Sequence, residues 1–207
     1  MSEPTEIARY SPEERGNHWL VALLFIFAAC SGLALYHPSF YFLSALVGGG
    51  PLTRILHPFI GVLMALFFSG LMMRFWHHNK FTDADRQWLK RIRDVIANRD
   101  EGLPEAGKYN AGQKRFFWTM VWCLGILLVS GIIMWRPYLA SQFPIGLVRF
   151  ATLAHAIAGF VVVLGVIVHV YAAIWVKGSL NAMIRGTVSE RWARAHHRAW
   201  YREVSGK

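Results

Sequence analysis

The sequence predicts an all-α integral membrane protein in which four transmembrane helices form a bundle. Three observations predict this fold. The 207 residues are 55% hydrophobic and only 16% charged, which is fewer charges than a soluble domain carries. Four stretches of 18 to 27 residues contain no Asp, Glu, Lys or Arg, and a hydrocarbon core of roughly 30 Å needs about 20 helical residues. The formal net charge of +10 is carried by the segments between those stretches.

The four apolar stretches are predicted to be helices, because lipid offers no other partner to the backbone groups of an open segment. They comprise residues 19–36, 55–73, 116–135 and 150–176. The last is long enough to tilt or to extend past the interface. We predict a single membrane domain over residues 1–207, with a connecting loop at 74–115 and a tail at 177–207.

The basic residues predict the orientation of the helices. The N-terminal segment, the 74–115 loop and the 177–207 tail hold 19 of the 22 Lys and Arg and all 12 Asp and Glu. Because cytoplasmic loops are enriched in Lys and Arg, both termini are predicted to be cytoplasmic. These charges also suit anionic lipid headgroups. A nucleic-acid-binding protein is basic as well, but it lacks long charge-free apolar runs, so nucleic acid is excluded as a partner.

The connections carry weaker signals. In the 74–115 loop we predict a helix over residues 82–98, with Thr82 as N-cap and Asp83 and Asp85 in its first turn. The connections at 38–54 and 136–149 are short and apolar. We expect them to pack against the membrane surface, with interfacial helices or re-entrant turns as the alternative.

Histidines inside the apolar stretches are the clearest functional signal, because such residues are costly in lipid unless they have a partner or a function. His155 and His169 are 14 residues apart in the fourth stretch. At about 100° per residue this is nearly four turns, so both point to one face, about 21 Å apart along the axis. That spacing suits two ligand sites stacked across the membrane better than one shared metal.

Depth in the membrane supplies a partner for each of these histidines. His57 lies near the same end of its stretch as His155, and His18 lies at the depth of His169. Bundle cores commonly hold cofactors between facing helices. We therefore predict that His57 and His155 axially ligate one haem and that His18 and His169 ligate a second. The sequence contains no C-x-x-C-H, so it has no signal for covalent attachment of haem.

A small residue lies four positions from each of the four histidines, one helical turn towards the membrane centre and on the same face. A flat macrocycle needs a helix surface without bulk at that point. The alternative is ordinary close packing, for which membrane helices use glycine freely; the recurrence at all four histidines favours haem packing. The small residues are Gly61, Gly159, Gly165 and Ala22.

The remaining histidines fit the ligand pattern less well. His37 precedes a proline, His77 and His78 follow the second apolar stretch, and His196 and His197 lie in the basic tail. We interpret these five as interfacial or surface residues and keep His78 as the reserve ligand.

Several segments around these positions resemble a known family. The resemblance extends from about His18 to Glu203 and is carried by HPFIG around His57, RFWHHN, GKYNAGQK, WRPY, HVYAAIWVKGS and the tail RWARAHHRAWYRE. These segments resemble the gamma subunit of respiratory membrane-bound formate dehydrogenase, a cytochrome b556. Cytochrome b subunits of membrane-bound hydrogenase and thiosulfate reductase share the histidine pattern more than the GKYNAGQK block, and they remain an alternative. A haem-free membrane anchor or transporter is an alternative of another class.

The resemblance implies two haem b groups and a path for electrons. Formate is oxidised by a molybdenum or tungsten catalytic (alpha) subunit outside the bacterial cytoplasmic (inner) membrane. Electrons then pass through an iron–sulfur (beta) subunit to the outer haem at His57 and His155, to the inner haem at His18 and His169, and on to quinone. The resemblance also implies a higher oligomer of this heterotrimer. This chain has no molybdenum or iron–sulfur motif, so we expect no formate oxidation by the chain itself.

The resemblance further places a menaquinone or ubiquinone site at the cytoplasmic side, at Asn110, Gly112 and Gln113, with His169 close by. Asn and Gln amides can donate hydrogen bonds to a quinone carbonyl, and Gly112 lets the backbone approach a ring closely. The residues by themselves also fit a turn followed by a helix cap.

No Asp or Glu lies in any of the four apolar stretches, where proton pumps usually place carboxylates. We therefore expect a redox loop, in which electrons cross inward and protons join quinone from the cytoplasm. Asp100, Glu101 and Glu105 are candidates for the proton route or are solvated loop residues. Arg54 and Arg149 either neutralise haem propionates, dock the iron–sulfur subunit or anchor helix ends.

Overall fold

The computed structural model describes residues 6–97, 99 and 102–206. Within the described residues, contacts divide the chain into two compact units. The first, here called the span unit, comprises Gly16–Met73 and Met120–His169. The second, here called the polar unit, comprises the described parts of Met1–Arg15, Arg74–Thr119 and Val170–Lys207. The single domain expected over residues 1–207 stays a prediction.

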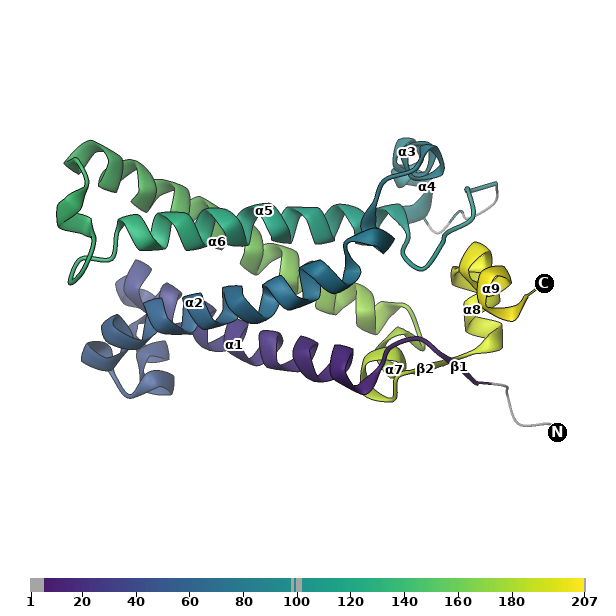
Figure 1. Ribbon diagram of the computed structural model, residues 1–207, viewed down its shortest axis with the longest axis horizontal. Coiled ribbons are helices and arrows are strands. Elements are labelled where there is room, and N and C mark those ends of the chain that lie inside the picture. Colours follow the sequence, from purple (N-terminus) through teal and green to yellow (C-terminus); the bar gives the residue numbers. More distant parts are fainter. Residues whose placement is uncertain (1–5, 98, 100–101, 207) are drawn as a thin grey trace. The chain divides into compact units, whose positions relative to one another are not determined.

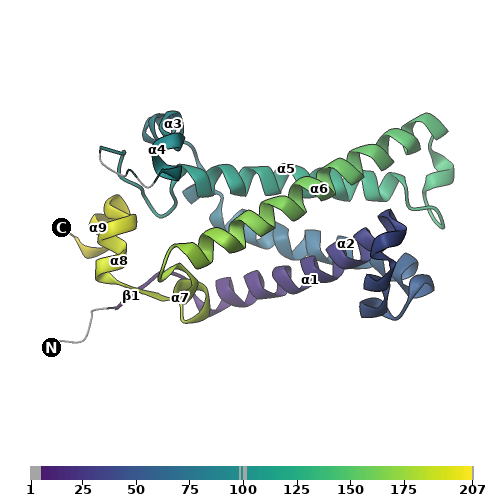
Figure 2. The ribbon, with the colours of Figure 1, turned by 180° about the vertical axis from the view of Figure 1, so that it is seen from behind.

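Four helices in the described part of the chain are long and apolar enough to cross a membrane, as the sequence predicted. They are α1 (Pro12–Tyr36), α2 (Gly50–Phe75), α5 (Ala111–Ile133) and α6 (Ile145–Trp175), and they form the long ribbons of Figures 1 and 2. Helix α1 begins seven residues before the apolar stretch at 19–36. Charge excludes residues from the bilayer core but not from a helix, and Glu13 and Glu14 suit a helix N-terminus.

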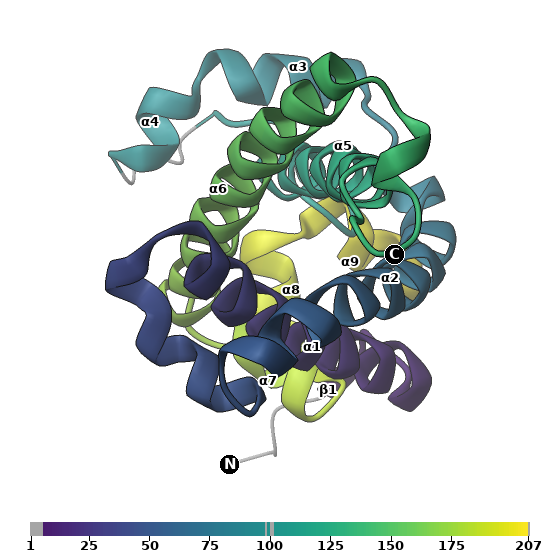
Figure 3. The same cartoon turned by 90° about the vertical axis from the view of Figure 1, so that its left-hand side faces the viewer.

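The span unit buries small side chains and exposes large apolar ones, as membrane proteins do. Small residues are buried between the helices, among them Ser31, Ala151 and Ala158. Large apolar side chains point outward; Phe160 and Ile167 of α6 are 65% and 59% exposed. A water-soluble protein rarely exposes so large an apolar surface, whereas a membrane supplies the apolar partner. In Figure 3, α5 is seen nearly end-on and α6 crosses the view obliquely, so the long helices are inclined to one another.

The connection between α1 and α2 forms a ten-residue 3-10 helix, η1 (Pro38–Val47). His37 is its N-cap, and the Nδ1 atom of His37 accepts a hydrogen bond from the Ser39 backbone N–H at 3.2 Å. Gly48 ends it with φ 85°, a left-handed conformation that glycine adopts without strain. The α5–α6 connection contains η3 (Ala140–Gln142). Whether these connections lie at a membrane interface stays a prediction.

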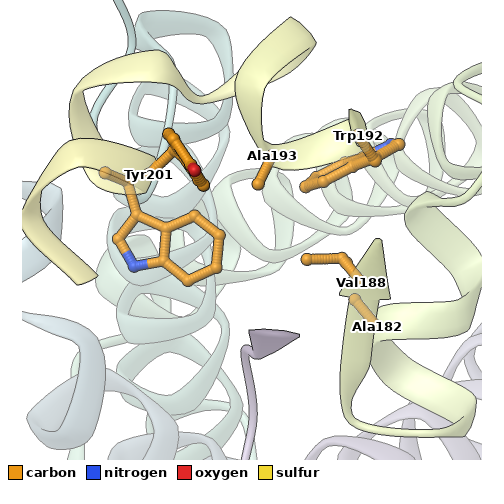
Figure 4. Packing of buried hydrophobic residues seen from close by; sticks show 6 residues of the cluster. Ala182, Val188, Trp192, Ala193 and Tyr201 are labelled. Atoms are coloured by element: carbon orange, nitrogen blue, oxygen red, sulfur yellow. The ribbon is translucent and has the colours of Figure 1, made fainter. Parts of the chain in front are cut away.

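In the polar unit, two short strands join distant parts of the chain. Strand β1 (Glu6–Ala8) pairs antiparallel with β2 (Thr187–Ser189), with Ile7 opposite Val188. Around β2 lie the helices α7 (Ser179–Ile184), α8 (Glu190–His196) and α9 (Arg198–Ser205). Their buried apolar side chains form one cluster (Figure 4) comprising Ala182, Val188, Trp192, Ala193, Trp200 and Tyr201.

The loop after α2 holds η2 (His77–Asn79), α3 (Asp83–Lys90) and α4 (Ile92–Ile96). Thr82 caps α3 as predicted, in a capping box completed by Asp85. The single helix expected over 82–98 is wrong, because the helix breaks at Arg91 (φ −103°, ψ 21°). The Arg91 guanidinium donates a 2.7 Å hydrogen bond to the Gly102 carbonyl, a long-range contact that no local pattern signals.

Candidate haem-binding site

Four helices of the span unit each contribute one residue to a cluster around His57 and His155. The imidazole rings of His57 (α2) and His155 (α6) face each other, with centroids 6.3 Å apart and planes at 73°. The Oγ atom of Ser31 (α1) lies 2.8 Å from Nδ1 of His57. The Oγ atom of Ser130 (α5) lies 2.9 Å from Nδ1 of His155. Nδ1 of each ring is therefore hydrogen-bonded to a serine on the helix that precedes it in the chain.

A second pair lies at the other end of the same unit. The rings of His18, near the start of α1, and His169, near the end of α6, have centroids 6.4 Å apart and planes at 54°. His18 also packs edge-on against Trp19. The Nδ1 atom of His18 is buried and has no hydrogen-bond partner among the described residues. The structure thus brings together the two histidine pairs that the sequence predicted.

Each of the two histidine pairs fits the axial ligation of one iron of its own. Bonds from histidine nitrogen to a metal are about 2.0–2.1 Å long, and two rings on opposite sides of one ion then have centroids about 6 Å apart. The observed separations are 6.3 and 6.4 Å. Each pair supplies two nitrogens, which suits a metal whose remaining ligands come from a macrocycle.

The small residues near the histidines leave room beside them. A Cβ atom added to Gly61 would meet no atom within 4 Å, and one added to Gly159 would meet a single side-chain atom of Leu127, at 3.8 Å. Gly165 in α6 and Ala22 in α1 are half-buried. These residues leave the helix surfaces near the histidines without bulk, as a flat ring requires. Their role in packing haem stays a prediction.

The predicted quinone residues lie in the polar unit at the start of α5, whereas His169 belongs to the span unit. Asn110 and Gln113 form a reciprocal cap: each backbone N–H donates to the other's side-chain oxygen at 2.9 Å. A Cβ atom on Gly112 would lie 3.3 Å from the Trp88 ring, so its small size also serves packing. Within the described residues, the two side-chain NH₂ groups make no hydrogen bond and stay available as donors.

A cavity of about 230 Å³ lies next to this cap in the polar unit. Its walls include Asn110, Trp88 and Asp85. Lys114 is in the same wall, and its ammonium lies 2.7 Å from the Asp85 carboxylate, with both side chains 9% exposed. Burial raises the pKa of Asp85, but the hydrogen bonds from Lys114 and Thr82 outweigh it, so the pKa falls below its usual value.

Two of the other candidates, His78 and Glu105, have structural partners. His78 lies edge-on to the Tyr109 ring, with centroids 6.3 Å apart. Glu105 forms ion pairs with Arg198 and Arg202, while Asp100 and Glu101 lie outside the described residues. Arg54 and Arg149 are exposed, and their roles stay predictions.

Comparisons with known proteins identify the family of the chain. A family model described as prokaryotic cytochrome b561 matches residues 9–186. The formate dehydrogenase cytochrome b556(fdo) subunit of Escherichia coli K12 is 46% identical over 204 residues, which cover 99% of this chain and 96% of the relative. The nitrate-inducible b556(Fdn) subunit of the same strain is 41% identical over 204 residues, with coverage of 99% and 94%. The formate dehydrogenase cytochrome b556 subunit of Haemophilus influenzae is 38% identical over 203 residues, with coverage of 98% and 85%.

The chain belongs to the formate dehydrogenase cytochrome b556 subunits. It is a multi-pass membrane protein and a subunit of a complex with other subunits. A cytochrome b is a haem protein, so membership implies haem b and weighs against a haem-free anchor or transporter.

Sequence reasoning missed four residues of the candidate site in this cytochrome b556 subunit: Ser31 and Ser130, and the glycines that follow them. A Cβ atom on Gly32 would lie 3.2 Å from Cε1 of His57, and one on Gly131 would lie 3.4 Å from Cε1 of His155. A signal was present, because the dipeptide Ser-Gly begins 26 residues before His57 and 25 residues before His155.

Proposed function

We propose that the chain is the di-haem, quinone-reducing electron-transfer subunit of a respiratory formate dehydrogenase. His57 and His155 hold one haem b, and His18 and His169 hold the other. The observation that carries the proposal is the occurrence of two facing histidine pairs at opposite ends of the span unit, one between α2 and α6 and the other between α1 and α6. The 14-residue spacing between His155 and His169 in α6 separates the two pairs by about 21 Å along the helix. Electrons could therefore cross a membrane through two haems, one near each surface.

We infer the direction of transfer from charge and family. The excess of Lys and Arg in the termini and in the 74–115 segment supports cytoplasmic termini in a bacterial inner membrane. The His57–His155 site then lies on the outer side and receives electrons from an iron–sulfur (beta) subunit. A molybdenum or tungsten (alpha) subunit supplies that subunit with electrons from formate, in a higher oligomer of the heterotrimer. The names of the relatives support formate as the source of electrons.

Electrons leave for menaquinone or ubiquinone on the cytoplasmic side. Asn110, Gly112 and Gln113, together with His169, are the residues we propose for quinone. The two amide NH₂ groups support this assignment, because a quinone carbonyl needs hydrogen-bond donors. The apolar stretches contain no carboxylate, which supports a redox loop in which protons enter quinone from the cytoplasm.

An optical spectrum of the purified complex tests the core of the proposal. We expect two b-type haems per chain; the absence of haem would end it. The large subunit that co-purifies decides between formate dehydrogenase and the hydrogenase or thiosulfate reductase alternatives.

The redox loop is tested separately, with the complex in sealed vesicles. Oxidation of formate with a quinone acceptor should take up protons only from the side that corresponds to the cytoplasm. Proton uptake by quinone on the opposite side would overturn the loop.

A further inference from the structure

We propose that Ser31 and Ser130 are positioning residues that fix the tautomer of His57 and His155 and lower the reduction potential of the haem held between them. This inference rests on the proposed function, because it requires haem at that pair.

The hydroxyl groups reveal which way each hydrogen bond runs. Ser31 Oγ lies 2.6 Å from the Phe27 carbonyl oxygen, and Ser130 Oγ lies 2.5 Å from the Ile126 carbonyl oxygen. A carbonyl oxygen can only accept, so each serine uses its single proton there. The lone pairs of each Oγ then accept the Nδ1–H of the histidine, at 2.8 and 2.9 Å.

This hydrogen bond leaves Nε2 of each histidine as the unprotonated nitrogen. A metal binds the unprotonated nitrogen, and a hydrogen bond from the other ring N–H fixes both the tautomer and the orientation of the ring. Ser31 and Ser130 are buried, with exposed fractions of 0% and 4%. Water therefore does not compete for the hydrogen bonds.

The same arrangement occurs twice. In α1 and again in α5, the serine is followed by a glycine whose position lies against Cε1 of the histidine, at 3.2 and 3.4 Å from an added Cβ. Ordinary serine back-bonding to the preceding turn needs neither the glycine nor the histidine. The repetition on two helices supports a role for the Ser-Gly pair at the cofactor.

The effect on the haem follows from charge. When Nδ1–H donates to an acceptor, the imidazole becomes a more basic ligand. A more basic ligand favours the oxidised iron, which carries the higher positive charge, so the reduction potential falls. At the other pair, Nδ1 of His18 has no such acceptor among the described residues. The serines thus lower the potential of the His57–His155 haem, and a lower potential favours transfer of electrons away from this haem.

The test compares Ser31→Ala and Ser130→Ala with Ser69→Ala in the complete complex. Ser69 is the matched control, because its hydroxyl donates to the Ala65 carbonyl in the same way, at 2.8 Å, and within the described residues it has no hydrogen bond to a histidine. The potential of each haem is measured by potentiometry at the haem absorption band, and the ligand field by electron paramagnetic resonance.

We expect each alanine variant to raise the potential of one haem, with a threefold to tenfold change in its ratio of reduced to oxidised form, or about 30–60 mV. The second haem and the Ser69→Ala complex keep their potentials. Ser31→Cys and Ser130→Cys keep the shape of the side chain but accept hydrogen bonds only weakly. They should give smaller shifts, and they replace an alanine variant that assembles poorly.

Unchanged potentials in all four variants, with both haems bound, would overturn the inference and leave the proposed function intact. A shift of equal size in Ser69→Ala would overturn it too. A wild-type complex without haem would instead refute the proposed function.

Discussion

Histidines of the two units show two ways to bury an imidazole. His197 of the polar unit is 2% exposed, and both its nitrogens are bonded to protein: Nδ1 donates to the Gly107 carbonyl at 2.7 Å, and Nε2 lies 3.3 Å from the Arg9 guanidinium. In His57 and His155 of the span unit, Nδ1 lies 2.8 and 2.9 Å from a serine hydroxyl, and the two rings face each other.

The difference shows which observation indicates a ligand. Burial alone does not, because His197 is the most deeply buried of the three. A buried histidine whose ring lies beside another histidine and that bonds protein through Nδ1 still has Nε2 to offer to a metal, whereas both ring nitrogens of His197 are bonded to protein.

The largest effect should come from removing a ligand. His155→Ala removes one of the two nitrogens at its site, so the purified complex should contain one haem per chain instead of two. His197→Gln, in the polar unit, should keep both. The pyridine haemochrome spectrum per mole of chain measures this, and two haems retained in His155→Ala would contradict the ligand assignment.

The next effect concerns a buried charge in the polar unit. Lys114→Met leaves the Asp85 carboxylate without its cation, and breaking a buried pair in this way costs about 3 kcal/mol. Amide hydrogens of α3 should then exchange about 100-fold faster in the complex. The double variant Asp85→Asn with Lys114→Met should recover most of the protection. If it does not, packing by the lysine rather than charge is what matters.

A smaller effect is expected from acid. Burial, with the nearby Arg9, lowers the pKa of His197 to about 3, whereas an unfolded histidine has a pKa of about 6.5. The unfolded state therefore binds a proton first, and stability that is full above pH 6.5 falls towards pH 3. At pH 5 the polar unit should lose about 2 kcal/mol.

Amide exchange in α8 and α9, corrected for the intrinsic pH dependence, measures this loss. Replacement of His197 by Gln should flatten the pH profile between 6.5 and 5. A profile unchanged by the substitution would assign the acid sensitivity to another group.

The smallest effect tests the space beside the histidines. A Cβ atom at Gly61 or at Gly125 would meet no atom within 4 Å. If haem packs at Gly61, Gly61→Ala should weaken haem retention about tenfold, or about 1.4 kcal/mol, whereas Gly125→Ala should not. Haem loss on dilution into apomyoglobin gives the comparison, and equal behaviour of the two variants would assign Gly61 to ordinary lipid-facing surface.

Much of the span unit could be predicted from the sequence, because lipid imposes length and composition on each helix and helical periodicity places His155 and His169 on one face. The serines could not be assigned a role, since a serine in a membrane helix usually bonds its own preceding turn. Only the fold shows that Ser31 also reaches His57 on another helix.

The polar unit was less predictable, because its structure depends on residues far apart in the chain. Nothing local signals that Ile7 pairs with Val188 or that Arg9 lies over the rings of Trp192 and Trp200, at 5.0 and 4.6 Å. The same reason explains His197, which was interpreted as a surface residue and is buried.

The pairing of β1 with β2 has a consequence for biogenesis. The two strands are separated by the four long helices, so β1 emerges from the ribosome first and has no partner until residues 187–189 have been synthesised. An unpaired strand edge is a site for aggregation. The pairing also requires both strands on one side of the membrane, which an even number of crossings provides. The β1–β2 pair therefore forms only after the chain has been translated past α6 and all four helices have been inserted into the membrane. A nascent chain in which one helix fails to insert keeps β1 unpaired.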